Sequence, residues 1–136
     1  MPPLTERQAV QQIIANDPLF HVEDRVVRGE TLPVFVNAPD SLRSLLRLSA
    51  DRYAASELML YREERMTYGA FAERVWRFAH HLEVEYQIAP GDRVAIAMPN
   101  NPEYLIAVMA IASLGSVVVY LNAWWTTPEL EYGFQD

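Results

Sequence analysis

The 136-residue sequence contains no cysteine and no lysine. Without cysteine there is no disulfide, no thiolate metal ligand and no thiol nucleophile, a pattern that fits a reducing compartment, and we expect a cytoplasmic protein. All 11 basic residues are arginine. Mechanisms that need a lysine ammonium, such as a Walker-type phosphate loop or a Schiff base, are therefore excluded for this chain.

Glycine is also scarce, and the five glycines stand singly. No glycine-rich loop is therefore available to cradle a phosphate group. The formal net charge of -7 argues against nucleic acid or an anionic membrane surface as a partner. The first residues carry charges and lack an apolar core segment, so we expect no secretory signal.

What is present is an ordinary globular composition, with 51% hydrophobic and 21% charged residues, enough to bury one core. Residues 1–39 form a first predicted domain, an N-terminal helix and β-hairpin arm. Thr5 to Gln8 is a capping-box pattern that opens a helix ended by Asp17-Pro18. Strands are predicted at 22–28 and 31–36, joined by a type II′ turn at Gly29-Glu30, and Pro33 places the second strand at an edge.

Residues 40–136 form a second predicted domain. A helix after Ser41 is expected to place four apolar residues on one side: Leu42, Leu45, Leu46 and Tyr53. A strand follows at 57–61. The helix predicted over 68–86 begins after Thr67 and carries one buried stripe: Phe71, Val75, Phe78 and Leu82. Its opposite side carries the charged pair Glu73 and Arg77.

A strand–helix–strand unit is predicted over residues 93–121. After a type II turn at Pro90-Gly91, a strand runs from 93 to 98. Asn101 and Pro102 then begin a helix that ends near Gly115. The uncharged run 117–121 predicts a strand buried on both faces. A last helix is predicted to begin near Thr127. These elements predict an α/β fold, a mostly parallel sheet with helices on its faces and a right-handed crossover.

Residues 104–128 carry no charge, a length that would also suit a transmembrane helix. Gly115, the β-branched run after it and Asn122 split this stretch into a helix and a strand. We therefore predict no transmembrane segment.

The residues that could carry chemistry are explained more simply by structure. His80 and His81 are adjacent and point about 100° apart on a helix, so they cannot chelate one ion together, and His21 lies in a loop. Asp92-Arg93 has no catalytic partner, and Glu103 would repel an anion at the helix start near Asn100. Trp124-Trp125 follows a strand end, where α/β ligand sites lie, but packing is the favoured explanation for the pair.

Five short motifs follow one another from residue 65 onward, and their order and spacing together carry a resemblance that none carries alone. They are Met66-Thr67-Tyr68-Gly69 with Arg74 through Ala79 and Leu82, then Pro90-Gly91-Asp92-Arg93-Val94-Ala95-Ile96, then Pro99-Asn100-Asn101-Pro102-Glu103, then Gly115-Ser116-Val117-Val118-Val119 with Leu121-Asn122-Ala123-Trp124-Trp125, and last Pro128-Glu129-Leu130-Glu131-Tyr132. Residues 65–136 resemble the N-terminal portion of the adenylate-forming acyl-CoA synthetases. The hairpin with Asn37-Ala38-Pro39 is similar to the arm of bacterial fatty-acid–CoA ligases.

The resemblance implies that a parent enzyme activates a carboxylic acid, in particular a fatty acid, with Mg-ATP, and that coenzyme A then displaces AMP from the acyl-adenylate. In that family a Ser/Thr/Gly-rich loop with a lysine and a second, C-terminal lysine stabilise the transition-state charge. Neither motif is present here. We therefore assign no catalytic, cofactor-binding or metal residue, and expect this chain alone to be inactive and to bind ATP, Mg²⁺ and coenzyme A weakly at most.

Two other interpretations stay open. The parent enzyme could load a carrier protein instead of coenzyme A, or the chain could be a non-catalytic binding or assembly module. If residues 40–136 are only the first α/β part of an AMP-binding large domain, the helix 102–114 and the strand 117–121 lack some of their partners. We then expect self-association through uncovered apolar surface.

Overall fold

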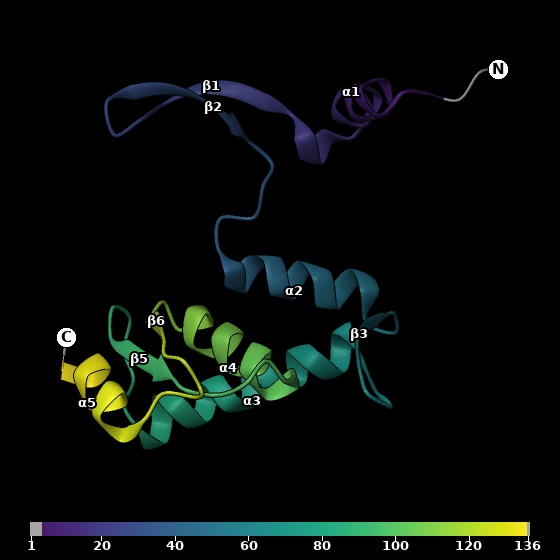
Figure 1. The fold of residues 1–136 in the computed structure, drawn as a ribbon. Coiled ribbons are helices and arrows are strands. Elements are labelled where there is room, and N and C mark those ends of the chain that lie inside the picture. The colour runs from purple at the N-terminus through teal and green to yellow at the C-terminus, as the bar shows by residue number, and fades with distance from the viewer. Residues whose placement is uncertain (1–3, 136) are drawn as a thin grey trace. The chain divides into compact units, whose positions relative to one another are not determined.

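The computed structural model describes residues 4–135, which divide into two compact units (Figure 1). Unit 1 ends at Asp40 and unit 2 begins at Ser41. The elements of unit 1 are α1 (Glu6–Asn16), the 3-10 helix η1 (Pro18–Phe20), β1 (Val22–Val27) and β2 (Glu30–Phe35). Those of unit 2 are α2 (Leu42–Tyr53), β3 (Glu57–Tyr61), β4 (Glu64–Thr67), α3 (Tyr68–Glu85), β5 (Arg93–Ile96), α4 (Pro102–Ser113), β6 (Val117–Tyr120) and α5 (Thr127–Gln135).

Helix α1 begins with the predicted capping box. The Thr5 hydroxyl accepts a hydrogen bond from the Gln8 amide, and the Gln8 side-chain oxygen accepts one from the Thr5 amide at 3.0 Å. Two of the helix's unsatisfied N–H groups are thereby paired. Asp17 ends the helix and caps η1, accepting from the Leu19 amide at 2.9 Å.

The hairpin forms, but the predicted position of its turn is wrong by one residue. Val27 pairs with Glu30, so the loop consists of Arg28 and Gly29. Both have positive φ, 53° and 91°, as a type I′ turn requires and a type II′ turn does not. Glu30 therefore belongs to β2. Because this sheet has only two strands, the strand that carries Pro33 is an edge strand, as predicted.

Unit 2 holds the core, which lies between α2, α3 and α4 (Figure 1). Thr67 caps α3, accepting from the Ala70 amide at 3.2 Å. The predicted stripe of α3 is buried except for Phe78, which is half-buried. Glu73 and Arg77 form the expected ion pair. The buried apolar residues are Leu46, Met66, Phe71, Ala72, Val75, Ala79, Leu82, Ile96, Ile106, Ala107, Ala110 and Ile111.

The apolar side predicted for α2 is only partly buried. Ser41 caps this helix, accepting from the Ser44 amide at 3.1 Å. Leu46 is buried, whereas Leu42, Leu45 and Tyr53 remain exposed. Helix α2 packs against α3 and α4, and of these four residues only Leu46 belongs to the buried core cluster.

The strands form three separate small sheets, which corrects the predicted mostly parallel sheet. Within residues 4–135 there are three two-stranded sheets; β1–β2 and β3–β4 are antiparallel, and only β5–β6 is parallel. Parallel strands need a long crossover, whereas a short turn makes an antiparallel pair. Strand β4, absent from the predicted elements, follows β3 through such a turn, with Arg62 at φ 56°.

The unit β5–α4–β6 is the predicted βαβ crossover. Asn101 caps α4, and Gly115 ends it at φ 79°. The Ser116 amide donates to Ile111 and the Gly115 amide to Ala112, which is the Schellman arrangement. Strand β6 is not buried on both faces as predicted, because its two end residues are half exposed and it lies at a sheet edge. Within residues 4–135, no helix combines the length and apolarity needed to cross a bilayer.

Candidate functional site at the carboxyl edge of the parallel strands

The parallel pair β5–β6 sets one edge of unit 2 apart. Arg93 pairs with Val117 and Ile96 with Tyr120, so the carboxyl ends of both strands lie together. The Leu121 amide continues the pairing by donating to the Ile96 carbonyl at 2.9 Å. In open α/β sheets, ligands bind outside this end of the strands. The loops that leave it, residues 97–101 and 121–126, are the candidate site.

The loop after β5 is occupied with starting a helix. The Asn101 side-chain oxygen accepts from the Tyr104 amide at 3.0 Å, and Pro102 is buried at the first helical position. Glu103 adds a carboxylate to the first turn, where it interacts favourably with the positive end of the helix dipole and repels anions. Asn101 therefore acts as a cap, as its position in the sequence predicted.

The loop after β6 gives the two tryptophans different environments. The Asn122 side-chain oxygen accepts from the Trp124 amide at 2.9 Å, which fixes the turn. The Trp124 side chain is 80% exposed. The Trp125 ring instead lies against α5, so close that a Cβ at Gly133 would stand 2.9 Å from its Cζ3 atom. Trp125 is thus a packing anchor, and Trp124 is left at the edge.

A cavity of about 300 Å³ opens beside this edge, between β3 and the start of α4. Tyr104, at its wall, also contacts the Tyr120 ring, with centroids 6.1 Å apart. The lining is apolar and amide, with no charged side chain: Met59, Leu60, Tyr61, Asn100, Asn101, Pro102, Tyr104 and Leu105. Such a surface suits an apolar group and supplies no counter-charge for a phosphate.

The remaining candidates are held in structural contacts or lie exposed on the surface. Asp92 accepts from the Ala89 amide at 2.8 Å and so stabilises the turn before β5. The Asp92 amide donates to the Ala89 carbonyl, and Gly91 has φ 91°, consistent with the predicted type II turn. His21 pairs with Glu23 on an exposed strand, at 3.2 Å. Within residues 4–135, no group of three or more His, Asp or Glu side chains could hold a metal ion.

One contact between helices was not predicted from the sequence. The Arg43 guanidinium lies over the Trp76 ring, 5.7 Å from its centroid, and donates to the Ser113 carbonyl at 3.3 Å. A cation is favourable there because the carboxyl end of α4 carries partial negative charge. Arg43 therefore ties α2 to α3 and α4. His80 and Glu83 help to line a cavity of about 250 Å³ beside Arg43 and Trp76.

At the start of helix α5, the Glu129 carboxylate forms hydrogen bonds with Thr126, the residue before the helix. Glu129 accepts from the Thr126 amide at 2.7 Å and from the Thr126 hydroxyl at 2.8 Å. These hydrogen bonds, the one from the amide first, hold the pKa of Glu129 below its ordinary value. The spacing of Thr126 and Glu129 is itself the sequence signal for a capping box. The Glu129 carboxylate thus stabilises the start of α5, next to the candidate site.

Comparison with known proteins places this arrangement in a family. The profile described as "AMP-binding enzyme" matches residues 46–136. The long-chain-fatty-acid–CoA ligase of Salmonella typhimurium is 36% identical over 108 residues, which cover 77% of this chain and 19% of that protein. The Escherichia coli O157:H7 protein of the same name is 35% identical over the same length. This chain thus spans about a fifth of the length of these curated relatives.

Solved structures agree with the fold. The N-terminal domain of FACL13 from Mycobacterium tuberculosis superposes with a TM-score of 0.64 at 29% identity, covering 70% of this chain and 24% of that one. The fused adenylation–PCP protein NpsA-ThdA from Klebsiella oxytoca gives a TM-score of 0.69 at 20% identity over 75% of this chain and 19% of its own. The second likeness bears on fold alone. On the strength of the profile match, the chain belongs to the AMP-binding enzyme family of adenylate-forming enzymes.

Proposed function

We propose that this chain supplies the N-terminal α/β part of an AMP-forming acid–CoA ligase that acts on a fatty acid in the cytoplasm. The observation that carries the proposal is the family match over residues 46–136, together with 36% identity to a protein named long-chain-fatty-acid–CoA ligase. In this proposal residues 1–39 are an arm, and residues 40–136 are the first α/β part of the AMP-binding large domain.

The residues present do not fit the triphosphate of ATP. The cavity beside the parallel strands has no charged lining residue, and Glu103 adds negative charge nearby. The sequence has no lysine. A crowded phosphate needs preorganised positive charge or N–H donors to stabilise its transition state. We therefore derive no catalytic step from these residues and assign them a scaffold role: caps, turns and the βαβ crossover.

The first test is made on the chain itself. We expect pyrophosphate–ATP exchange, measured with a panel of fatty acids, to stay at the level of a no-protein control. Each missing oxyanion-type donor alone removes about 10²–10³ of the rate. Acid-dependent exchange clearly above that control would show that these residues hold a complete adenylation site.

The second test asks whether the chain can serve as part of such an enzyme. In a chimera, residues 46–136 replace the matching segment of the Salmonella typhimurium ligase. We expect fatty-acid-dependent acyl-CoA formation to survive. A Val75→Asp chimera is the control, because it buries a charge in the core and should abolish folding and activity. A chimera that folds but adenylates no acid would contradict the proposal.

The acceptor requires a separate measurement. Coenzyme A and a carrier protein, offered side by side to the proposed ligase, distinguish a CoA ligase from a carrier-loading enzyme. We expect transfer to coenzyme A. Transfer to the carrier protein alone would indicate a carrier-loading enzyme instead of a CoA ligase.

A further inference from the structure

Three helices of unit 2 meet around one small cavity, which lies where α2 and α3 approach the carboxyl end of α4. Its volume is about 250 Å³. Trp76, Ala79, His80 and Glu83 all line it from α3, because positions i, i+3, i+4 and i+7 are neighbours on one helix face. The other two helices contribute Arg43 from α2 and Ser113 from the end of α4.

The cavity combines buried lining residues with a charged rim. Ala79 and Ser113 are each only 5% exposed, whereas Arg43, His80 and Glu83 are exposed. Trp76 is half-buried between these two groups. A small molecule in the cavity would therefore contact an aromatic ring and charged side chains at the same time.

The positive charge of the rim is held in position. The Arg43 guanidinium lies over the Trp76 ring, 5.7 Å from its centroid, and donates to the Ser113 carbonyl at 3.3 Å. A guanidinium has five N–H donors, and this is the one hydrogen bond that it forms with the described residues. Its other donors are left for an acceptor, and a carboxylate matches their fork geometry best.

Glu83 brings the opposite charge to the same cavity. Within residues 4–135, neither Glu83 nor Arg43 takes part in an ion pair. The two charges thus line one cavity without pairing across it. The carboxyl end of α4 adds partial negative charge beside them.

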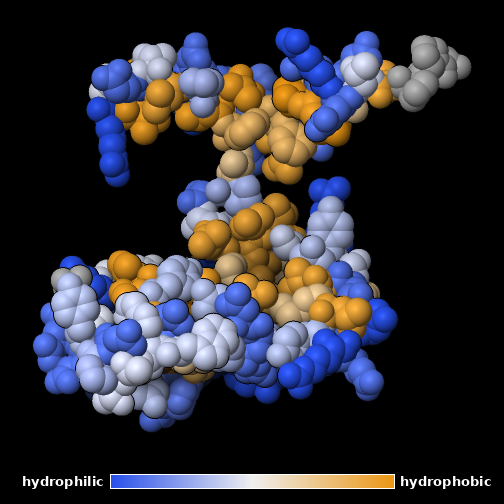
Figure 2. Space-filling view, in the orientation of Figure 1, coloured by the Kyte–Doolittle hydropathy of each residue, from blue (hydrophilic) through white to orange (hydrophobic). Residues whose placement is uncertain are grey.

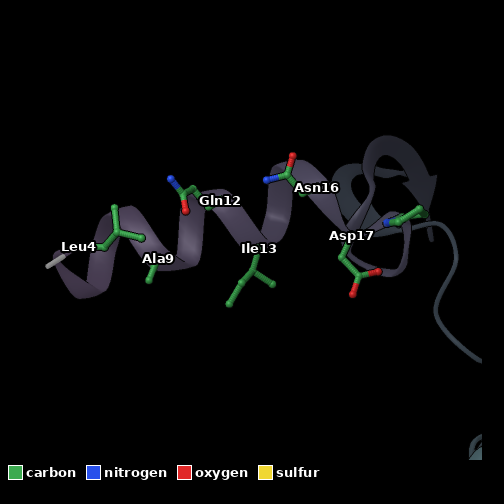
Figure 3. A pocket seen from close by; sticks show the side chains of 7 residues that line it. Leu4, Ala9, Gln12, Ile13, Asn16 and Asp17 are labelled. Carbon is green, nitrogen blue, oxygen red and sulfur yellow. The ribbon is translucent and has the colours of Figure 1, made fainter. Parts of the chain in front are cut away.

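A larger concavity along α1 lacks this combination. It is lined from Leu4 to Pro18 by one helix and its ends, and Asp17 is the one charged residue among the described residues that line it. Figure 3 shows its side chains pointing to different sides of the helix, with Gln12 and Asn16 opposite Ile13. Exposed charge by itself is common, since Figure 2 shows hydrophilic residues over much of unit 2. Opposite, unpaired charges around a half-buried ring are the distinguishing feature of the cavity between the three helices.

We propose that this cavity binds a small dipolar ion of the α-amino acid type, with its carboxylate at Arg43 and its ammonium at Glu83. A simple anion would be repelled by Glu83 and by the end of α4, and a simple cation would be repelled by Arg43. A dipolar ion is attracted by both charges. Trp76 and Leu114 offer an apolar wall for its side chain. The volume lies just below the range of about 300–1,000 Å³ that drug-sized ligands occupy, which favours a small amino acid.

The first test measures the binding of matched probes to the full 136-residue chain. L-Alanine and L-leucine carry both charges, whereas isopentylamine is leucine without its carboxylate and isocaproate is leucine without its ammonium. The indole N–H signal of Trp76 in NMR spectra of the isotope-labelled chain reports on the cavity, and those of Trp124 and Trp125 are internal references. We expect at least one of the amino acids to shift the Trp76 signal saturably, with a Kd below about 1 mM. Both single-charge analogues should bind at least about tenfold more weakly, because each loses a hydrogen bond between charged groups.

A pair of glutamate variants assigns the ammonium end. Glu83→Gln removes the carboxylate from the rim. Glu85→Gln is the matched control, because Glu85 is also exposed on α3 and is not among the residues that line the cavity. We expect Glu83→Gln to weaken amino acid binding at least about tenfold without weakening that of isocaproate. Glu85→Gln should change amino acid binding by less than about twofold, because charges outside the cavity are screened.

A pair of arginine variants assigns the carboxylate end. Arg43→Gln should weaken amino acid binding without weakening that of isopentylamine, and Arg47→Gln, one turn further along α2, is the matched control. Because Arg43 also ties three helices together, circular dichroism first establishes that this variant is folded; if it is not, the glutamate pair decides. The proposal would be overturned if neither amino acid shifted the Trp76 signal saturably, if leucine and its two analogues bound equally, or if the two glutamate variants had equal effects.

Discussion

The two units use the same local devices and differ in what they bury. Helix α1 in unit 1 and helix α3 in unit 2 both begin with a threonine cap. Helix α3 then buries Val75 and its neighbours against α4, whereas α1 buries nothing. Capping contributes about 1 kcal/mol, and burial contributes about 1.5–3 kcal/mol for each large side chain. Local signals thus form elements in both units, and only unit 2 gains a core from them.

The largest expected difference between the units is in the effect of truncating one isoleucine in each. Ile111 in α4 is 1% exposed, and Ile13 in α1 is 52% exposed. Ile111→Ala should lower the free energy of unfolding by about 2–5 kcal/mol because it leaves a cavity. In the monomeric chain, Ile13→Ala should change it by less than about 0.5 kcal/mol, because this side chain is exposed. Urea unfolding followed by circular dichroism measures both.

The comparison would break if Ile13→Ala destabilised the chain as much as Ile111→Ala. That result would mean that Ile13 is covered in solution. Repeating the measurement over a range of protein concentrations distinguishes cover by a second copy, which strengthens with concentration, from cover within one chain, which does not.

A smaller effect is expected from two glycines with positive φ. Gly115 at 79° ends α4, and Gly29 at 91° lies in the hairpin turn. An added Cβ would meet only ordinary contact at Gly115, 3.4 Å from Pro90, and open space at Gly29. Alanine at either position therefore costs mainly backbone strain, about 1 kcal/mol. Gly115→Ala should shift the main unfolding transition, and Gly29→Ala should loosen only the hairpin.

Hydrogen exchange of single amides resolves this difference. We expect faster exchange of unit 2 amides in Gly115→Ala and of β1–β2 amides alone in Gly29→Ala. Faster exchange across both units in Gly29→Ala would show that the two units unfold together.

Helices and their ends could be predicted from the sequence because the signals are local. Thr5, Ser41, Thr67 and Asn101 all cap the helices they were expected to cap. The start and end of such helices depend on side chains within one turn. Gly115 as the end of α4 is predictable for the same reason, since few other residues tolerate its backbone angle.

Strand environment was less predictable because it depends on distant partners. The run Val117 to Tyr120 has the composition of a buried strand, yet β6 pairs with β5 alone among the described residues. Strand β4 was missed because Glu64 and Arg65 obscure its pattern, and only Met66 within it is buried. The turn at Arg28 was misplaced because an arginine at positive φ is uncommon.

The candidate site could be predicted only in part. The carboxyl edge of the parallel pair follows from the βαβ pattern, and the cap role of Asn101 follows from its position. The different environments of Trp124 and Trp125 could not be predicted, because they depend on how Gly133 lets α5 approach. That no residue of this chain is catalytic remains a prediction, which the exchange assay tests.

The smallest expected effect compares two helix starts, the capping box of α1 in unit 1 and the Thr126–Glu129 hydrogen bonds at α5 in unit 2. In α1 the capping side chain is Gln8, which does not titrate, and in α5 it is Glu129. Hydrogen bonds from the Thr126 amide and hydroxyl lower the pKa of Glu129 below its ordinary value of 4.5. The stabilisation of α5 is therefore fully present above that ordinary value. It is lost as the pH falls through the lowered pKa of the folded chain.

We expect amide exchange at the start of α5 to accelerate, relative to the start of α1, as the pH falls below that value. Glu129→Gln is the matched control, because glutamine keeps an acceptor for the Thr126 amide but does not titrate. In this variant the acid-induced difference between the two helices should disappear. If the difference persisted in Glu129→Gln, some other carboxyl would be responsible, and the contrast between a neutral cap in unit 1 and a titrating cap in unit 2 would fail.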